Sequence, residues 1–244
     1  MFESATSSSL AKWASSYTYI PHKGSFTFSA ERSGCYRSKI YRIQGQVFAD
    51  TTLSDTFSLN GGTVQIGSLS FGAAAVTNSY AKIIPTVDIP NAQANFGINT
   101  TFQMAGNTLT GVLPCSLNMY VPEEIEITNR NCCEYGISKS SDLIITWNAD
   151  ASNNEGVYIV FAYDGPLSNQ LNSSLSAISL KVSQWVNDNG SYTIPNGAFS
   201  SFPVGGQVTI LIMRGNIGYG ITSIGEKYKF EAYTSATHHD HLIN

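Results

Sequence analysis

Residues 227–233 read Lys-Tyr-Lys-Phe-Glu-Ala-Tyr, and this stretch decides the fold class. From Lys227 to Glu231 charged residues stand at every second position, and aromatic residues stand between them. A period of two predicts a β-strand with one face in a core and the other in water. The stretch therefore predicts an antiparallel sheet that is wet on one side.

The same grammar extends outward along the chain. Residues 157–163 and 208–213 are apolar at successive positions, which is typical of central strands. In 64–71 the apolar phase changes across Gly67 and Ser68, which predicts a β-bulge. Helix signals are short and confined to 9–15 and 167–175. The fold class that follows is all-β.

The texture of the sequence changes near 120–124, where prolines and three glutamates interrupt the strands. After this point seven strand-like runs follow within about 120 residues, which is the size and spacing of an immunoglobulin-like sandwich. We therefore predict two β-sandwich domains, an N-terminal one at 1–120 and an immunoglobulin-like one at 121–244. The glycine-rich segment 215–225 is interpreted as a β-turn.

The C-terminal half also resembles a known family. It contains a strand that ends in Trp147, a hairpin Asp-Asn-Gly-Ser-Tyr-Thr-Ile-Pro at 188–195, and a Gly-Gly turn that leads into a strand ending in Arg214. These motifs resemble the immunoglobulin-like β-sandwich of bacterial exported surface proteins and lipoproteins. The resemblance implies export, anchoring through a removed N-terminal segment and a role at the cell surface. It implies no catalytic residues.

Composition excludes several partners. Thirteen basic residues against seventeen acidic ones leave no surplus to neutralise phosphates, so we expect no nucleic-acid binding. The longest apolar runs are far shorter than a membrane span, and 1–30 lacks the pattern of a signal peptide. Serine, threonine, asparagine and tyrosine in place of lysine and glutamate favour an exported protein whose signal was removed. We expect an extracellular, cell-surface or periplasmic location.

The four cysteines, Cys35, Cys115, Cys132 and Cys133, are disulfide candidates in an exported chain. Cys115 lies near the vicinal pair, so a bond to Cys132 or to Cys133 closes a short loop and leaves Cys35 for the other. A vicinal bond is strained and least favoured. Four free thiols are the alternative.

Aromatic residues gather among polar ones in the N-terminal part. They are Trp13, Tyr17, Tyr19, Tyr36 and Tyr41. An exposed row of this kind stacks on sugar rings, whereas the alternative is that these are ordinary strand aromatics.

Catalytic and metal signals are weak. Glu123, Glu124 and Glu126 are sequential, which favours an acidic linker over a catalytic pair that converges from separate elements. Residues 238–241 (His-His-Asp-His) have suitable metal ligands, but adjacent residues on a mobile terminus favour an adventitious site. The oxygen-rich stretch 148–155 is interpreted as a solvated hairpin loop rather than a calcium site. We expect no catalytic residues, no metal site and no cofactor.

Three functions remain in order. The first is a non-enzymatic secreted or surface protein acting in binding, adhesion or surface structure, with a glycan or a protein as its ligand. The second is a carbohydrate-binding module that uses the N-terminal aromatics. The third is a glycan hydrolase, which needs carboxylates that meet in a cleft.

Overall fold

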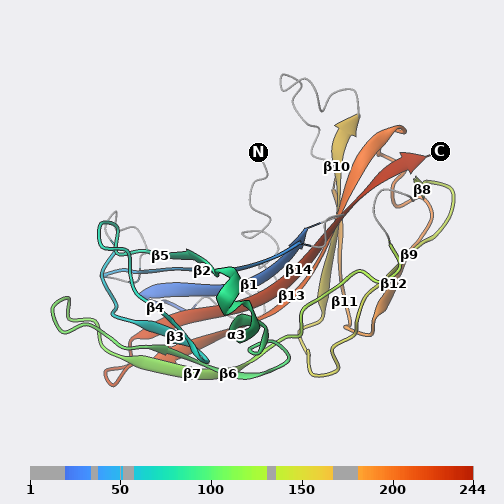
Figure 1. Ribbon diagram of the computed structural model, residues 1–244. Coiled ribbons are helices and arrows are strands. Elements are labelled where there is room, and N and C mark those ends of the chain that lie inside the picture. Colours follow the sequence, from blue (N-terminus) through green and yellow to red (C-terminus); the bar gives the residue numbers. More distant parts are fainter. Residues whose placement is uncertain are drawn as a thin grey trace. The chain divides into compact units, whose positions relative to one another are not determined.

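The computed structural model describes residues 20–33, 38–49, 51, 58–130, 136–166 and 181–243. The all-β fold class is confirmed, because strands dominate these ranges and their single α-helix is the short α3 (Ile89–Gln93), which follows the 3-10 turn η1 (Thr86–Asp88). The strands are β1 (Gly24–Ser33), β2 (Ser38–Val47), β3 (Val64–Ile66), β4 (Leu69–Phe71), β5 (Tyr80–Ile83), β6 (Ile98–Met104), β7 (Cys115–Val121), β8 (Gly136–Ser138), β9 (Leu143–Thr146), β10 (Val157–Pro166), β11 (Lys181–Val186), β12 (Ser191–Ile194), β13 (Gly206–Ile221) and β14 (Lys227–Ile243) (Figure 1).

The chain divides into two compact units, each assembled from three segments. Unit 1 comprises Met1–Ala30, Ile40–Glu124 and Gly215–Tyr233, and the rest forms unit 2. Gly215–Tyr233 belongs to unit 1 although it lies far beyond residue 120 in the sequence. Whether 1–120 and 121–244 are independently folding domains stays a prediction, because compactness alone does not show that a segment folds by itself.

Unit 1 is a β-sandwich of two sheets. Strands β13, β14, β1, β2 and β5 are neighbours in that order in one sheet, and β4, β3, β6 and β7 form the other. Figure 1 shows β6 and β7 in green below β1, β14 and β13. Phe26 and Phe230 from the first sheet lie in one core with Phe102 from the second, each at most 1% exposed. The alternation predicted for 227–233 is thus confirmed on its inner face.

The segment 215–225 corrects a sequence-based prediction. It was interpreted as a β-turn, but β13 continues to Ile221 and the turn that follows is only 222–226. A Cβ at Gly218 would overlap the Leu117 side chain, and one at Gly220 would meet Cys115 Sγ at 3.0 Å. The glycines therefore let β7 pack closely over β13.

The phase change at 64–71 marks a tight hairpin and not the predicted bulge. Ile66 pairs with Leu69, so Gly67 and Ser68 form a two-residue turn between β3 and β4. Gly67 has a φ of 55°, which favours glycine at this position. Both kinds of irregularity shift the apolar phase, and the length of the flanking strands decides between them.

Unit 2 has the strand order of an immunoglobulin-like sandwich. Strands β11, β10, β13 and β14 are successive neighbours, while β9 pairs with β12. This order corresponds to the C′, C, F and G strands opposite B and E, as the sequence predicts. Trp147 is 3% exposed and packs in the core with Ile159 and Ile210.

Membrane crossing by a helix was also tested by length and hydropathy. Within the described ranges, no helix is both long enough and apolar enough to span a bilayer.

Candidate functional site

The outward positions of the second sheet of unit 1 carry one kind of chemistry. They alternate with the core residues of β3, β4, β6 and β7, and each is an amide or a hydroxyl. We call this set the polar platform: Gln65, Ser70, Asn99, Thr101, Gln103, Ser116, Asn118 and Tyr120. All are exposed except Tyr120, which is half-buried. A water-facing sheet surface of this size without a charged side chain is unusual in composition.

Strand register places these side chains in rows across the sheet. Gln65 lies opposite Ser70 on one side and Gln103 on the other, and Gln103 lies opposite Ser116. The next row pairs Thr101 with Asn118. Directly opposed side chains have Cβ atoms about 5 Å apart, so each row is a continuous line of hydrogen-bonding groups.

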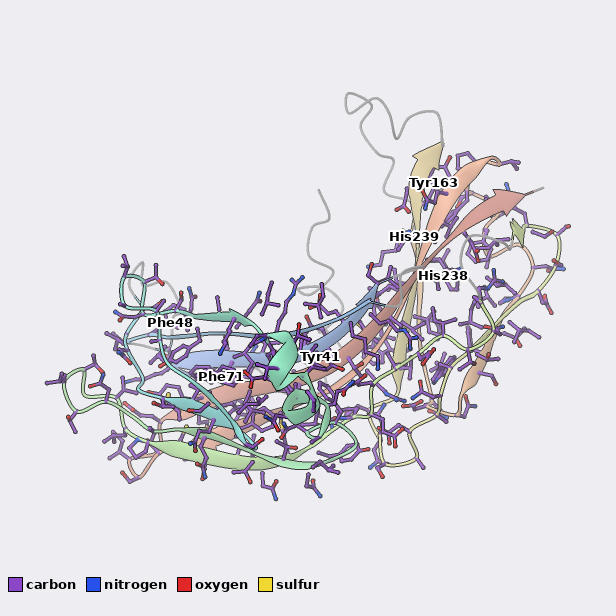
Figure 2. The ribbon with its side chains drawn as sticks, viewed as in Figure 1. Tyr41, Phe48, Phe71, Tyr163, His238 and His239 are labelled. Carbon is purple, nitrogen blue, oxygen red and sulfur yellow. The ribbon has the colours of Figure 1, made fainter. Side chains whose placement is uncertain are left out.

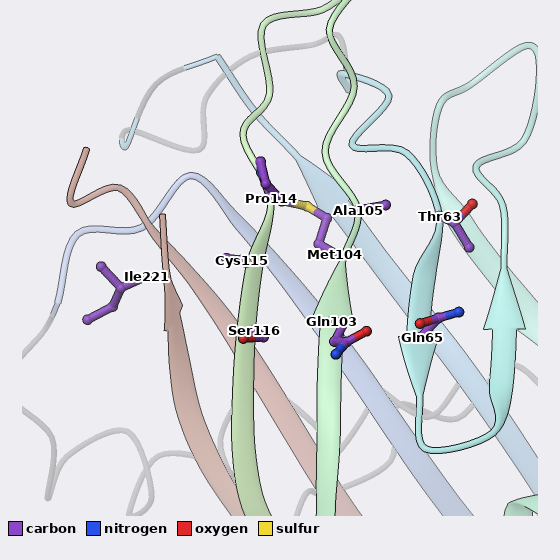
Figure 3. Close-up of a pocket in the computed structure, with 9 residues that line it drawn as sticks. All are labelled: Thr63, Gln65, Gln103, Met104, Ala105, Pro114, Cys115, Ser116 and Ile221. Atoms are coloured by element: carbon purple, nitrogen blue, oxygen red, sulfur yellow. The ribbon is translucent and has the colours of Figure 1, made fainter. Parts of the chain in front are cut away.

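The longest row ends in a groove of about 440 Å³. Figure 3 shows the two glutamine side chains on neighbouring strands at this groove. Its lining residues are Thr63, Gln65, Gln103, Met104, Ala105, Pro114, Cys115, Ser116 and Ile221. The groove thus combines amide and hydroxyl groups with a smaller number of apolar side chains, a mixture common in sites for small uncharged ligands.

Cys115 lines the groove with a buried thiol that is 7% exposed. Desolvation raises its pKa to about 12, so the thiol stays protonated and is a poor nucleophile at neutral pH. Cys35, Cys132 and Cys133 lie outside the described residues. The predicted bond between Cys115 and one of the vicinal pair therefore stays a prediction.

Tyr41 was predicted to join an exposed aromatic row, but its side chain is in the core of unit 1. It is 1% exposed, and its hydroxyl donates a 2.7 Å hydrogen bond to Glu124 Oε1 (Figure 2). Burial, followed by this hydrogen bond, raises the pKa of the phenol. A buried ring cannot stack on a sugar, because both of its faces contact protein. The other four aromatics, Trp13, Tyr17, Tyr19 and Tyr36, lie outside the described residues and stay predictions.

The acidic stretch near residue 124 does not form a catalytic pair in its described contacts. Glu124 accepts the hydrogen bond from Tyr41, whereas Glu126 is in an ion pair with Arg32. Each carboxylate therefore has a separate structural contact, which agrees with the linker interpretation.

Residues 238–241 correct another prediction, since they belong to β14 and not to a mobile terminus. His238 and Asp240 are buried at 5% and 0% exposure, and Arg130 forms an ion pair with Asp240. His239 lies on the opposite face of the strand, where its Nδ1 is 2.9 Å from Thr209 Oγ1 (Figure 2). Strand alternation separates the neighbouring imidazoles, so they cannot converge on one ion.

A carboxylate completes the His239 contact. Thr209 donates its hydroxyl proton to Asp164, whose pKa is raised by burial. This arrangement links three neighbouring strands of unit 2. In the part of the chain that the structure describes, no cluster of three or more His, Cys, Asp or Glu side chains is arranged to hold a metal ion.

The stretch 148–155 is also held by internal contacts. Asp150 is 4% exposed and accepts a hydrogen bond from the Ser152 amide. Beside it, Asp188 accepts hydrogen bonds from Arg214, Trp147 and Asn153 at 2.8–2.9 Å. This is a buried network that fixes the loop, so the predicted solvated hairpin is correct in being a loop and wrong in being solvated.

The polar platform was missed by the sequence reasoning, although a signal for it exists. Residues 98–104 and 115–121 each alternate between core residues and uncharged polar ones. Only the register shows that these polar positions face the same side.

Fold and surface together define an all-β sandwich protein with an uncharged polar sheet face. No family model and no curated protein matches the chain. Among solved structures, it is similar to one described as "Crystal structure of chicken CNTN1 FN1-FN3 domains", with 14% identity and a TM-score of 0.20. The similarity covers 82% of this chain and 62% of that chain. A TM-score this low does not identify a shared fold, so the description above rests on the strand order alone.

Proposed function

We propose that this protein is a non-enzymatic binding module and that the polar platform of unit 1 binds a neutral glycan. The observation that carries the proposal is the charge-free composition of the eight outward positions. An exposed sheet face usually includes lysine or glutamate, and here each of these positions has an amide or a hydroxyl.

The chemistry of the side chains selects the ligand class. An amide offers two donors and an acceptor, and a hydroxyl offers both roles, which matches the hydroxyl groups of a sugar. A charged ligand would favour charged partners on the platform, since ionic hydrogen bonds are stronger. The groove beside Gln103 gives the face a concave place where a sugar ring can be enclosed.

This proposal changes the residues assigned to glycan binding. The sequence favoured stacking by N-terminal aromatics, whereas the platform supplies hydrogen bonds and one aromatic ring, Tyr120. A role in binding at a cell surface also agrees with the expected export of the chain, which is part of the proposal and has no separate support.

The test is affinity electrophoresis of the full chain through gels that contain glucan, mannan or xylan. We expect retardation by at least one neutral polymer. The double variant Gln65→Ala with Gln103→Ala should bind about tenfold more weakly, because each lost hydrogen bond contributes about 1 kcal/mol.

The matched control is Gln44→Ala with Gln46→Ala, which removes two exposed amides from β2 of the same unit. It should bind like the unchanged chain. Equal loss in both double variants, or retardation by no neutral polymer, contradicts the proposal. Turnover of a polymer that is abolished by Glu124→Gln would instead favour a hydrolase.

A further inference from the structure

One end of unit 1 is defined by the register of its strands. Phe71, Val64, Met104 and Cys115 lie in one row across the second sheet. The connections that continue beyond this row, 72–79 and 105–114, therefore leave the sheet at the same end. The turn 222–226 joins them, because Gly220 of β13 lies against Cys115. Figure 1 shows these three connections together at the left end of unit 1.

Each connection presents an aliphatic side chain to solvent. Val76 and Leu109 are both 94% exposed, and Ile224 is 68% exposed. We call these three residues the aliphatic tips. A single exposed aliphatic residue is ordinary on a protein surface, but one on each of three adjacent turns is a pattern.

The tips are fixed by their turns. Leu109 lies in a turn closed by reciprocal backbone hydrogen bonds between Asn107 and Val112, and its own amide donates to Asn107 Oδ1. The Ile224 turn is closed by the Gly225 amide, which donates to the Thr222 carbonyl. The Val76 turn is closed by the Asn78 amide, which donates to the Ala74 carbonyl. Held outward in this way, the three side chains lose little conformational freedom when they are buried.

Charge is nearly absent from the three connections. In 72–79, 105–114 and 222–226 the single charged residue is Glu226, which forms an ion pair with Lys23 at 2.5 Å. Such turns enter a less polar medium without the cost of desolvating unpaired charges.

We propose that this end of unit 1 docks on the surface of a neutral phospholipid bilayer, with the aliphatic tips inserted among the lipid chains. Separate side chains on three turns form no continuous patch for a protein partner, whereas a fluid bilayer closes around each one. The internally satisfied turn amides suit the same environment, since lipid offers the backbone few partners. The binding is peripheral and involves no spanning segment.

The inference does not depend on glycan binding. The test is flotation of the full chain with vesicles of phosphatidylcholine alone. We expect the unchanged chain to float with the vesicles. The triple variant Val76→Ser, Leu109→Ser, Ile224→Ser should lower the partition coefficient at least about tenfold, since it removes most of the inserted apolar area.

Val87→Ser is the matched control, because Val87 is 80% exposed in η1, beyond the other end of β5. It should float like the unchanged chain, and so should Gln65→Ala with Gln103→Ala. Absence of flotation by the unchanged chain, or equal flotation by the triple variant, overturns the proposal. Sedimentation velocity supplies a second readout: self-association that the triple variant abolishes would show that the tips bind a second copy, which also overturns it. A folded state of the variant is checked by its unchanged Tm.

Discussion

The two outer faces of unit 1 are built on the same alternation and differ in charge. On the first sheet, Glu231 of β14 forms an ion pair with Lys229 at 2.8 Å and accepts a hydrogen bond from Thr27 at 3.0 Å. On the second sheet, the polar platform carries amides and hydroxyls alone. The inner faces of both sheets are apolar and share one core.

This difference teaches that the platform's composition is not needed to form the sandwich. The core requires apolar side chains at alternate positions and places no demand on the outward ones except polarity. Paired charges satisfy that demand on the first sheet, and uncharged groups satisfy it on the second. The choice between them is therefore available to function.

The largest expected effect comes from breaking the sheet that carries the platform. Gly62 has a φ of 81°, and a Cβ there would overlap the carbonyl oxygen of Gly106. Gly62→Ala combines a left-handed backbone with a clash against backbone, so we expect a loss of about 3 kcal/mol in unfolding free energy. Urea denaturation measures it.

Gly111→Ala is the control for the backbone term. Gly111 has a φ of 72°, but a Cβ there meets nothing within 4 Å. We expect a loss of about 1 kcal/mol. Equal losses for the two variants would show that the Gly62 contact with Gly106 contributes nothing.

Sequence reasoning reached the fold further than the site. Binary alternation predicted the strands at 157–163, 191–194 and 227–233, since a side chain that faces a core must be apolar wherever the chain turns next. It failed at 215–225 and 238–241, where glycine and histidine resemble turn and tail residues until a second sheet or a buried arginine packs on them. The platform could not be seen, because which polar positions lie side by side depends on the register of distant strands.

The second prediction sharpens the contrast between the two faces. Glu231 is 6% exposed and has two partners, so Glu231→Ala should lower the unfolding free energy by about 1–2 kcal/mol. Gln103→Ala on the platform should change it by less than about 0.5 kcal/mol. Parallel urea titrations compare the two variants, and similar losses would mean that the platform amides also support the fold.

The third prediction concerns pH and the first sheet. Desolvation lowers the pKa of His22 below its usual 6.5, its bond to the Ile20 carbonyl opposes this, and the charges of Lys229 and Glu231 act on it with opposite signs. The unfolded chain therefore binds a proton first, so stability is full above pH 6.5 and falls as the pH drops toward the lower folded value. The Tm difference between the unchanged chain and His22→Gln should shift against the unchanged chain below pH 6.5 and be constant above it.

The smallest expected effect is a constancy, and it isolates the platform. Seven of its eight side chains do not titrate, and the eighth, Tyr120, is a phenol with an ordinary pKa near 10. Glycan affinity should therefore stay constant from about pH 5 to pH 8, while the stability of the same chain changes through His22. Affinity electrophoresis at both limits measures the first quantity, and thermal unfolding in the same buffers measures the second. An affinity that changed about tenfold across this range would require a carboxylate or an imidazole in the binding site, and it would move the site away from the polar platform toward a charged surface.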